Sequence, residues 1–335
     1  MLGIFLYAFN AIAPILILVI FGYLLKTKQL FKPDFFKQLN FFSFHYCFPM
    51  LMFTNLYSLG SIREINYRLA VFLIISIVTI TVVSFVVAQI VTDVPNRKGV
   101  LIQAGFRSNF AVIGLPLAEG MAGSVGGVLA ASMQAPVVIY FNFVSVLVLA
   151  LYSDDGKFDV VKIVKNVVSN PMIQGLGTGV IFLIAREFVP VNADGELIFS
   201  VKGTLPWLYT AISYLGRMGT PLCLIALGGQ FSFSDVPGVK KELISGVSMR
   251  LLMAPLIGFT MAFTAQRFGL LELSTSAVAI LIAAYGSPIA TSSAVMAAEM
   301  HADSTLAGQI VVWTCLLSML TVFAMIVFFR SMGML

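Results

Sequence analysis

Apolar segments of about 20 residues recur along the whole chain, and they restrict the fold more than any other feature of the sequence. They lack the alternation expected of barrel strands, so helices are predicted to cross the membrane. Only 10% of the residues are charged, which leaves too much apolar surface for a water-soluble domain. The chain is therefore predicted to be an all-α polytopic protein of the lipid bilayer. Ten segments qualify as transmembrane helices, near residues 8–25, 38–58, 69–92, 99–121, 125–151, 167–186, 206–231, 242–265, 274–298 and 304–329.

The positive charges lie mainly on one predicted side of the membrane. Eleven Lys and Arg residues fall in the loops after the first, third, fifth, seventh and ninth helices, and six fall on the opposite side. Cytoplasmic loops carry the excess of Lys and Arg, so both termini are predicted to lie outside a bacterial inner membrane. This asymmetry accounts for the net charge of +5, and no nucleic-acid partner is expected.

Paired prolines indicate an internal duplication. Pro49 lies 67 residues before Pro116, and the same spacing separates Pro221 from Pro288. The second pair follows the first by 172 residues. Each half holds five predicted helices, so the second half must enter the membrane in the opposite sense, as in the inverted repeats of secondary transporters. The expected organisation is a first repeat over 1–152, a cytoplasmic linker over 153–166 and a second repeat over 167–335.

Two of the predicted helices contain a glycine and a proline close together. Gly114 and Pro116 lie within 99–121, and Pro288 follows a glycine within 274–298. Proline removes a helical donor and clashes with the preceding turn, so both helices are expected to break. Unwound backbone at that depth is tolerated where it lines a cavity, and the N-terminus of a half-helix attracts an anion.

Polar residues beside the two breaks are candidates for binding a substrate. Asn109 lies seven residues before Pro116, which on a continuous helix places both on one face, and its amide suits a carboxylate. Thr291 and Ser292 offer hydroxyls, although helix capping or bonding to the preceding turn explains them equally well. Arg107 is predicted either to attract an anion or to extend its charge to the membrane surface. The candidate substrate site comprises Arg107, Asn109, Gly114, Pro116, Pro288, Ala290, Thr291 and Ser292.

Four segments resemble the auxin efflux carrier family in its short bacterial form: NFAVIGLPL from Asn109, NPMIQGLGTG from Asn170, TPLCLIALGGQ from Thr220 and YGSPIATSSAVMAAE from Tyr285. The resemblance covers nearly the whole chain. It implies a ten-helix fold with two crossed, proline-broken helices, similar to bile-acid/sodium symporters and sodium/proton antiporters. It also implies a scaffold of helices 1, 2, 6 and 7 and a moving part of helices 3–5 and 8–10. Members carry small carboxylates such as auxin, malonate or malate.

The sequence thus predicts an elevator-type transporter of a small organic anion, driven by the membrane potential or coupled to protons or sodium. No cofactor, no metal site and no enzymatic activity are expected, because the His-Glu-x-x-His motif and a pair of intramembrane aspartates are both missing. A homodimer is left open. The alternatives are an anion sensor or scaffold derived from a transporter, and a cation exchanger on the same fold.

Overall fold

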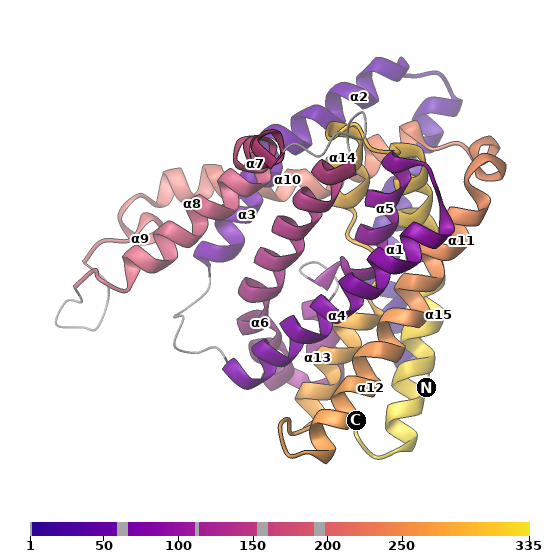
Figure 1. Cartoon of the computed structure of the whole chain (residues 1–335). Coiled ribbons are helices and arrows are strands. Elements are labelled where there is room, and N and C mark those ends of the chain that lie inside the picture. Colours follow the sequence, from indigo (N-terminus) through magenta and orange to yellow (C-terminus); the bar gives the residue numbers. More distant parts are fainter. Residues whose placement is uncertain (1, 59–65, 111–113, 153–159, 191–197) are drawn as a thin grey trace.

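The computed structural model describes residues 2–58, 66–110, 114–152, 160–190 and 198–335, and these residues are almost entirely helical (Figure 1). Their only β-structure is an isolated bridge between Ser108 and Ile289. In chain order the helices are α1 (Leu2–Thr27), α2 (Pro33–Phe42), α3 (Phe48–Tyr57), α4 (Tyr67–Val91), α5 (Pro95–Phe106), α6 (Leu115–Tyr152), α7 (Val160–Ser169), α8 (Pro171–Arg186), α9 (Val201–Thr204), α10 (Pro206–Gln230), α11 (Lys240–Ser248), α12 (Ala254–Arg267), α13 (Thr275–Gly286), α14 (Ser292–Glu299) and α15 (Ser304–Ser331).

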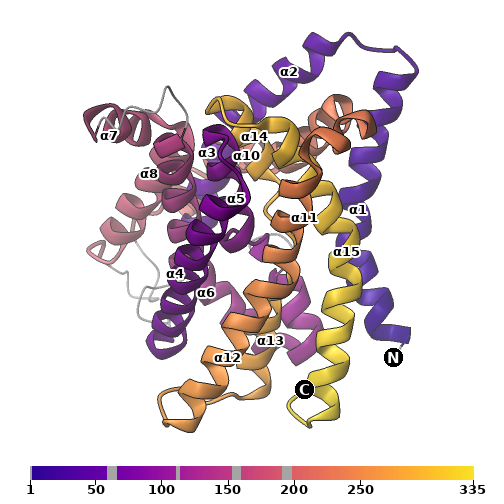
Figure 2. The ribbon, with the colours of Figure 1, turned by 45° about the vertical axis from the view of Figure 1, so that its right-hand side comes forward.

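Several of these helices are long and apolar enough to cross a membrane. Four qualify in the described residues: α4, α10, α15 and the unit Phe233–Arg267, which contains α11 and α12. A bent pair within α6 makes a fifth, and three shorter apolar helices add Ala13–Thr27, Pro171–Arg186 and Thr275–Gly286. The prediction of a multi-pass helical membrane protein is confirmed, while the number of ten spans stays a prediction. The start of α1 and the end of α15 lie at the same end of the molecule, and α2 and α7 lie at the other end (Figure 2).

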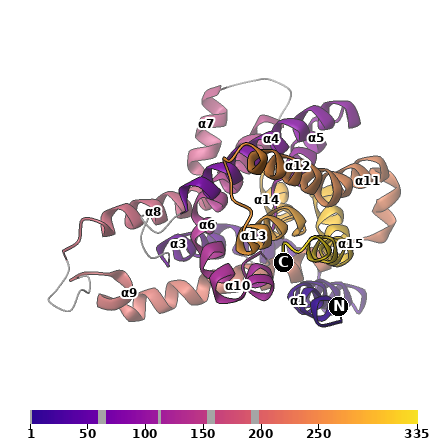
Figure 3. The same ribbon diagram turned by 90° about the horizontal axis from the view of Figure 1, so that it is seen from below.

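The helix contacts fall into two groups, which meet where α1 packs against α15; seen from below, α8 and α9 lie on the opposite side of the molecule from α11 (Figure 3). In one group α10 runs beside α1, α2 and α3, and α3 runs beside α8; in the other, α5 contacts α4, α6 and α11, and α13 contacts α6 and α15. Small residues allow close approach within the first group: a Cβ on Gly228 of α10 would meet the main chain of Val19 in α1. Close backbone contact at glycine is a common source of helix association where lipid removes the hydrophobic driving force.

Both of the helices predicted to break are interrupted. The first stops at Phe106, with Arg107 in extended backbone; Phe110 and Gly114 are π-helical, and the α-helix resumes at Leu115. The second stops at Gly286 and resumes at Ser292. The expectation that Asn109 and Pro116 share one face of a continuous helix is wrong, because the chain at Asn109 leaves the helix to pair with the other crossing segment.

The predicted linker is partly helical. Residues 160–166 form the beginning of α7, which ends at Ser169, and residues 153–159 lie outside the described part of the chain. The next helix then begins at Pro171, where the side chain of Asn170 caps it by accepting a hydrogen bond from Met172 N–H at 3.0 Å. Proline in the first turn and asparagine before it favour a helix start at this point rather than at 167.

Candidate functional site

The two unwound segments cross and hydrogen-bond to each other. The main-chain N–H of Asn109 donates to the Pro288 carbonyl at 2.8 Å, and the N–H of Ala290 donates to the Arg107 carbonyl at 3.2 Å. These two bonds form the antiparallel bridge centred on Ser108 and Ile289. Polar backbone that has left a helix inside a membrane needs such partners. The crossing therefore fixes the positions of the side chains on both segments.

A cavity of about 260 Å³ lies against this crossing. It is far larger than the roughly 10–15 Å³ that a single water molecule requires. Five of its lining residues, Arg107, Asn109, Ala290, Thr291 and Ser292, belong to the site predicted from the sequence. The remainder are supplied by the neighbouring helices and the crossing: Phe48, Leu51, Met52, Asn55, Ser108, Val138, Phe141, Asn142, Arg217 and Thr220.

Arg107 supplies a buried positive charge to the wall of the cavity. Its residue is only 2% exposed, so the interpretation that it extends to the membrane surface is wrong. The guanidinium donates to Asn142 Oδ1 at 3.0 Å, to Ser292 Oγ at 2.9 Å and to the Met296 sulfur at 3.1 Å. None of these partners is charged, and within the described residues Arg107 forms no salt bridge. A buried charge of this kind strongly favours a bound anion.

Two further features of the cavity favour negative charge. The side-chain nitrogen of Asn109 is buried and has no hydrogen-bond partner among the described residues. Helix α14 begins beside the cavity at Ser292, and the preceding Thr291 makes no side-chain capping bond. The capping role considered for the Thr291 hydroxyl is therefore not observed. A helix N-terminus carries partial positive charge, which adds to that of Arg107.

Three predicted site residues do not line the cavity. Pro288 contributes its carbonyl to the crossing rather than its ring to the cavity. Gly114 is buried next to the ring of Phe110, which a Cβ at this position would meet at 2.6 Å. The backbone of Pro116 lies in the first turn of α6, and its side chain is outside the described part of the structure.

The sequence prediction missed several polar residues of the cavity. Asn142 lies in α6, and Arg217 and Thr220 lie in α10. Their signal is a polar or charged residue within an apolar span, which is expensive in lipid and therefore often functional. Nothing in the local sequence, however, indicates that the side chains of Asn142, Arg217 and Thr220 face the crossing.

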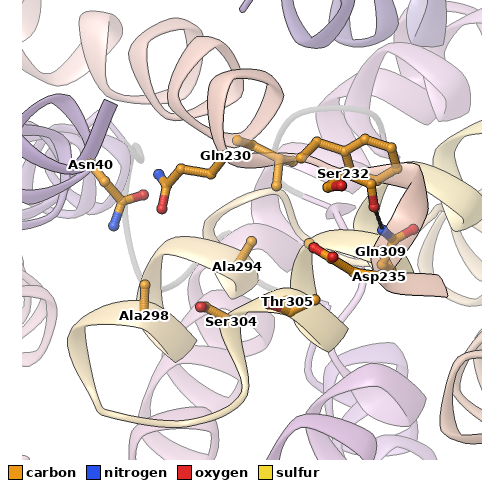
Figure 4. A pocket seen from close by; sticks show the side chains of 12 residues that line it. Asn40, Gln230, Ser232, Asp235, Ala294, Ala298, Ser304, Thr305 and Gln309 are labelled. Carbon is orange, nitrogen blue, oxygen red and sulfur yellow. Dashed lines mark hydrogen bonds between the residues drawn. The ribbon is translucent and has the colours of Figure 1, made fainter. Parts of the chain in front are cut away.

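A second, smaller cavity of about 110 Å³ lies further along α14, towards its C-terminal end (Figure 4). Ala294 and Ala298 of α14 line it, together with polar residues of neighbouring segments. The side chains of Asn40 and Gln230 point toward one another across it, and Gln309 donates to the Ser232 carbonyl at 2.7 Å. The two cavities therefore contact different parts of the same half-helix. The larger one lies between the start of α14 and helices α3 and α10, and the smaller one lies between the rest of α14 and helices α2 and α10.

Comparison with known proteins agrees with this arrangement. The sequence profile of a family described as "membrane transport protein" matches residues 7–174 and 183–326. A protein of Methanothermobacter thermautotrophicus described as an "uncharacterized transporter" is 25% identical over 326 residues, which cover 95% of this chain and 97% of the relative. The matched residues include both broken helices and both cavities. The chain belongs to the membrane transport protein family, the family of the auxin efflux carriers.

Proposed function

We propose that the protein is a secondary active or potential-driven carrier of a small organic anion that bears a carboxylate. The observation that carries this proposal is the buried guanidinium of Arg107, which has no acidic partner in the described residues and lines a cavity at the crossing. A carboxylate would supply the missing negative charge and accept two parallel hydrogen bonds from the guanidinium.

The other residues of the cavity have distinct roles in this proposal. The unpartnered Asn109 amide nitrogen donates a further hydrogen bond to the carboxylate, and the first turn of α14 at Ser292 adds its partial positive charge. Arg217 is exposed and lines the same cavity, so it offers a second cation to a dicarboxylate. The apolar side chains of Phe48, Met52 and other lining residues surround the carbon skeleton.

The finer architecture is part of the same proposal. Ten spans form two inverted repeats, 1–152 and 167–335, with both termini outside the bacterial inner membrane. Two broken helices that pair antiparallel at their crossing support this arrangement. The first, second, sixth and seventh spans serve as the scaffold, and the other spans carry the site past it as an elevator. The packing of α10 against α1, α2 and α3, and of α3 against α8, supports a separate scaffold.

The decisive experiment measures charge movement in proteoliposomes that contain the purified protein. A panel of small mono- and dicarboxylates is applied with and without sodium and pH gradients. A saturable current that is retained in Arg330→Gln, an exposed arginine in the last turn of α15, and lost in Arg107→Gln supports the proposal. Binding of the same anion with neither a current nor uptake of the anion into the proteoliposomes, under every gradient, indicates a sensor rather than a carrier. A current carried by cations alone indicates a cation exchanger.

A further inference from the structure

A second buried arginine, Arg250, lies where the two broken helices end. It belongs to a π-helical turn, Met249–Met253, between α11 and α12, and it is 1% exposed. Its guanidinium donates to four main-chain carbonyls. Two belong to the end of α5, Gly105 at 3.1 Å and Phe106 at 3.2 Å. The other two belong to the end of α13, Ala284 at 3.1 Å and Tyr285 at 2.6 Å.

The four carbonyls have a common electrostatic property. The last carbonyls of a helix lack intrahelical partners and together carry about half a negative charge. Helices that cross a membrane completely place this charge in water, but α5 and α13 both stop inside the protein. Two such ends sum to about one negative charge. The single positive charge of Arg250 matches this sum, and no described side chain forms a salt bridge with it.

We propose that Arg250 is the permanent counter-cation of the crossing, in the place where carbonyls of two half-helix C-termini would otherwise bind a metal cation. Unwound carbonyls and half-helix C-termini commonly hold sodium or a proton carrier in transporters with broken helices. Here the guanidinium already occupies the carbonyls of both ends. Sodium is therefore neither bound nor needed at this point, and any coupling ion must act elsewhere.

The two buried arginines consequently have opposite tasks. Arg250 satisfies the negative ends of the two half-helices, and its bonds are complete apart from Nε, which has no partner among the described residues. Arg107 lies beside the positive start of α14 and has only neutral partners. The charges at the crossing are thus balanced on the side of Arg250, whereas the side of the larger cavity keeps a net positive charge. A bound anion would balance that remaining charge.

Thermal unfolding of the purified protein tests this role without any substrate, so its result is separate from the transport measurement. A sodium-specific shift of the midpoint, relative to potassium and choline chloride at one ionic strength, is expected to be no larger in the wild type than in Arg250→Ala. Arg250→Ala is expected to lower the midpoint by about 5–10 °C relative to Arg267→Ala, an exposed arginine at the end of α12. Millimolar guanidinium is expected to restore part of this loss in Arg250→Ala and to have no such effect on Arg267→Ala.

If Arg250→Ala cannot be purified, Arg250→Lys provides the same test. A single ammonium has three donors and no planar fork, so it cannot reach four carbonyls on two helices, and an intermediate loss of stability is expected. A sodium-specific rise of the midpoint that is larger in the wild type than in Arg250→Ala overturns the proposal. So does an Arg250→Ala or Arg250→Lys protein as stable as Arg267→Ala, or a loss in Arg250→Ala that guanidinium does not reverse.

Discussion

Replacing Arg107 by glutamine tests whether the charge of this side chain binds the anion or stabilises the fold. The substitution removes a buried cation that lines the larger cavity and replaces it with a neutral, polar side chain. Truncating one partner of a buried, hydrogen-bonded charge pair costs about 2–4 kcal/mol of binding free energy. At 1.4 kcal/mol per tenfold change, the half-saturation concentration of the carried anion should rise by about 30- to 700-fold.

The effect of Arg107→Gln on stability should have the opposite sign to that of Arg250→Gln. Without a ligand, Arg107 is a buried charge with only neutral hydrogen-bond partners in the described residues. Its removal relieves a desolvation cost, so the unfolding midpoint of the ligand-free protein should be unchanged or higher. Arg250→Gln removes bonds to four carbonyls and should lower that midpoint.

The assay combines the anion concentration dependence of the transport current with thermal unfolding of the same preparations. Arg330→Gln, at the exposed end of α15, controls for general loss of positive charge. Half-saturation of Arg107→Gln within threefold of wild type would refute the assignment of the binding charge. Destabilisation as large as that of Arg250→Gln would show instead that Arg107 has a structural role.

Three other substitutions test separate features of the structure. Asn109→Ala removes the unpartnered amide donor and should weaken anion binding by about 1–3 kcal/mol, measured as a rise in half-saturation with an unchanged unfolding midpoint; an unchanged half-saturation would contradict its role. Ala298→Phe fills the smaller cavity between α14 and the scaffold helices α2 and α10, so it should block the proposed elevator movement and abolish the current while anion binding, measured by ligand-induced thermal shift, remains; a normal current would show that α14 does not move past α2 and α10 at this cavity. Gly228→Val places a side chain against the main chain of Val19 and should destabilise the packing of α1 on α10, with a lower unfolding midpoint than Gly238→Val, where a Cβ has open space.

Helix breaks and the membrane class were predictable from the sequence because they depend on local chemistry. Long apolar runs specify membrane helices, and proline beside glycine at Pro116 and Pro288 specifies interruption. The position at which the first helix breaks was predicted less accurately. The first helix stops at Phe106, well before Pro116, because the main chain of Arg107 and Asn109 pairs with Ala290 and Pro288 far along the chain. A pairing of this kind leaves no local pattern in the sequence.

The burial and the hydrogen-bond partners of the charged residues also could not be predicted from the local sequence. The sequence leaves Arg107 with two interpretations, and only the arrangement of α6 and α14 around it selects the buried one. The bonds of Arg250 depend on two distant helix ends. Gly105 at the end of α5 lies 145 residues before the arginine, and Ala284 at the end of α13 lies 34 residues after it. Burial and partners are tertiary properties, whereas an isolated arginine in an apolar span indicates only that some function or partner is required.

The bonds of Arg250 also have a consequence for biosynthesis. The carbonyl of Gly105 is made 145 residues before the arginine that satisfies it. At roughly 5–20 residues per second, this interval lasts about 7–30 s. During that time the end of α5 is in or near the membrane without its cation, so water or the insertion machinery must solvate it. The part of the chain that precedes Arg250 therefore cannot reach its final form on its own, because the end of α5 acquires its cation only when Arg250 has been made.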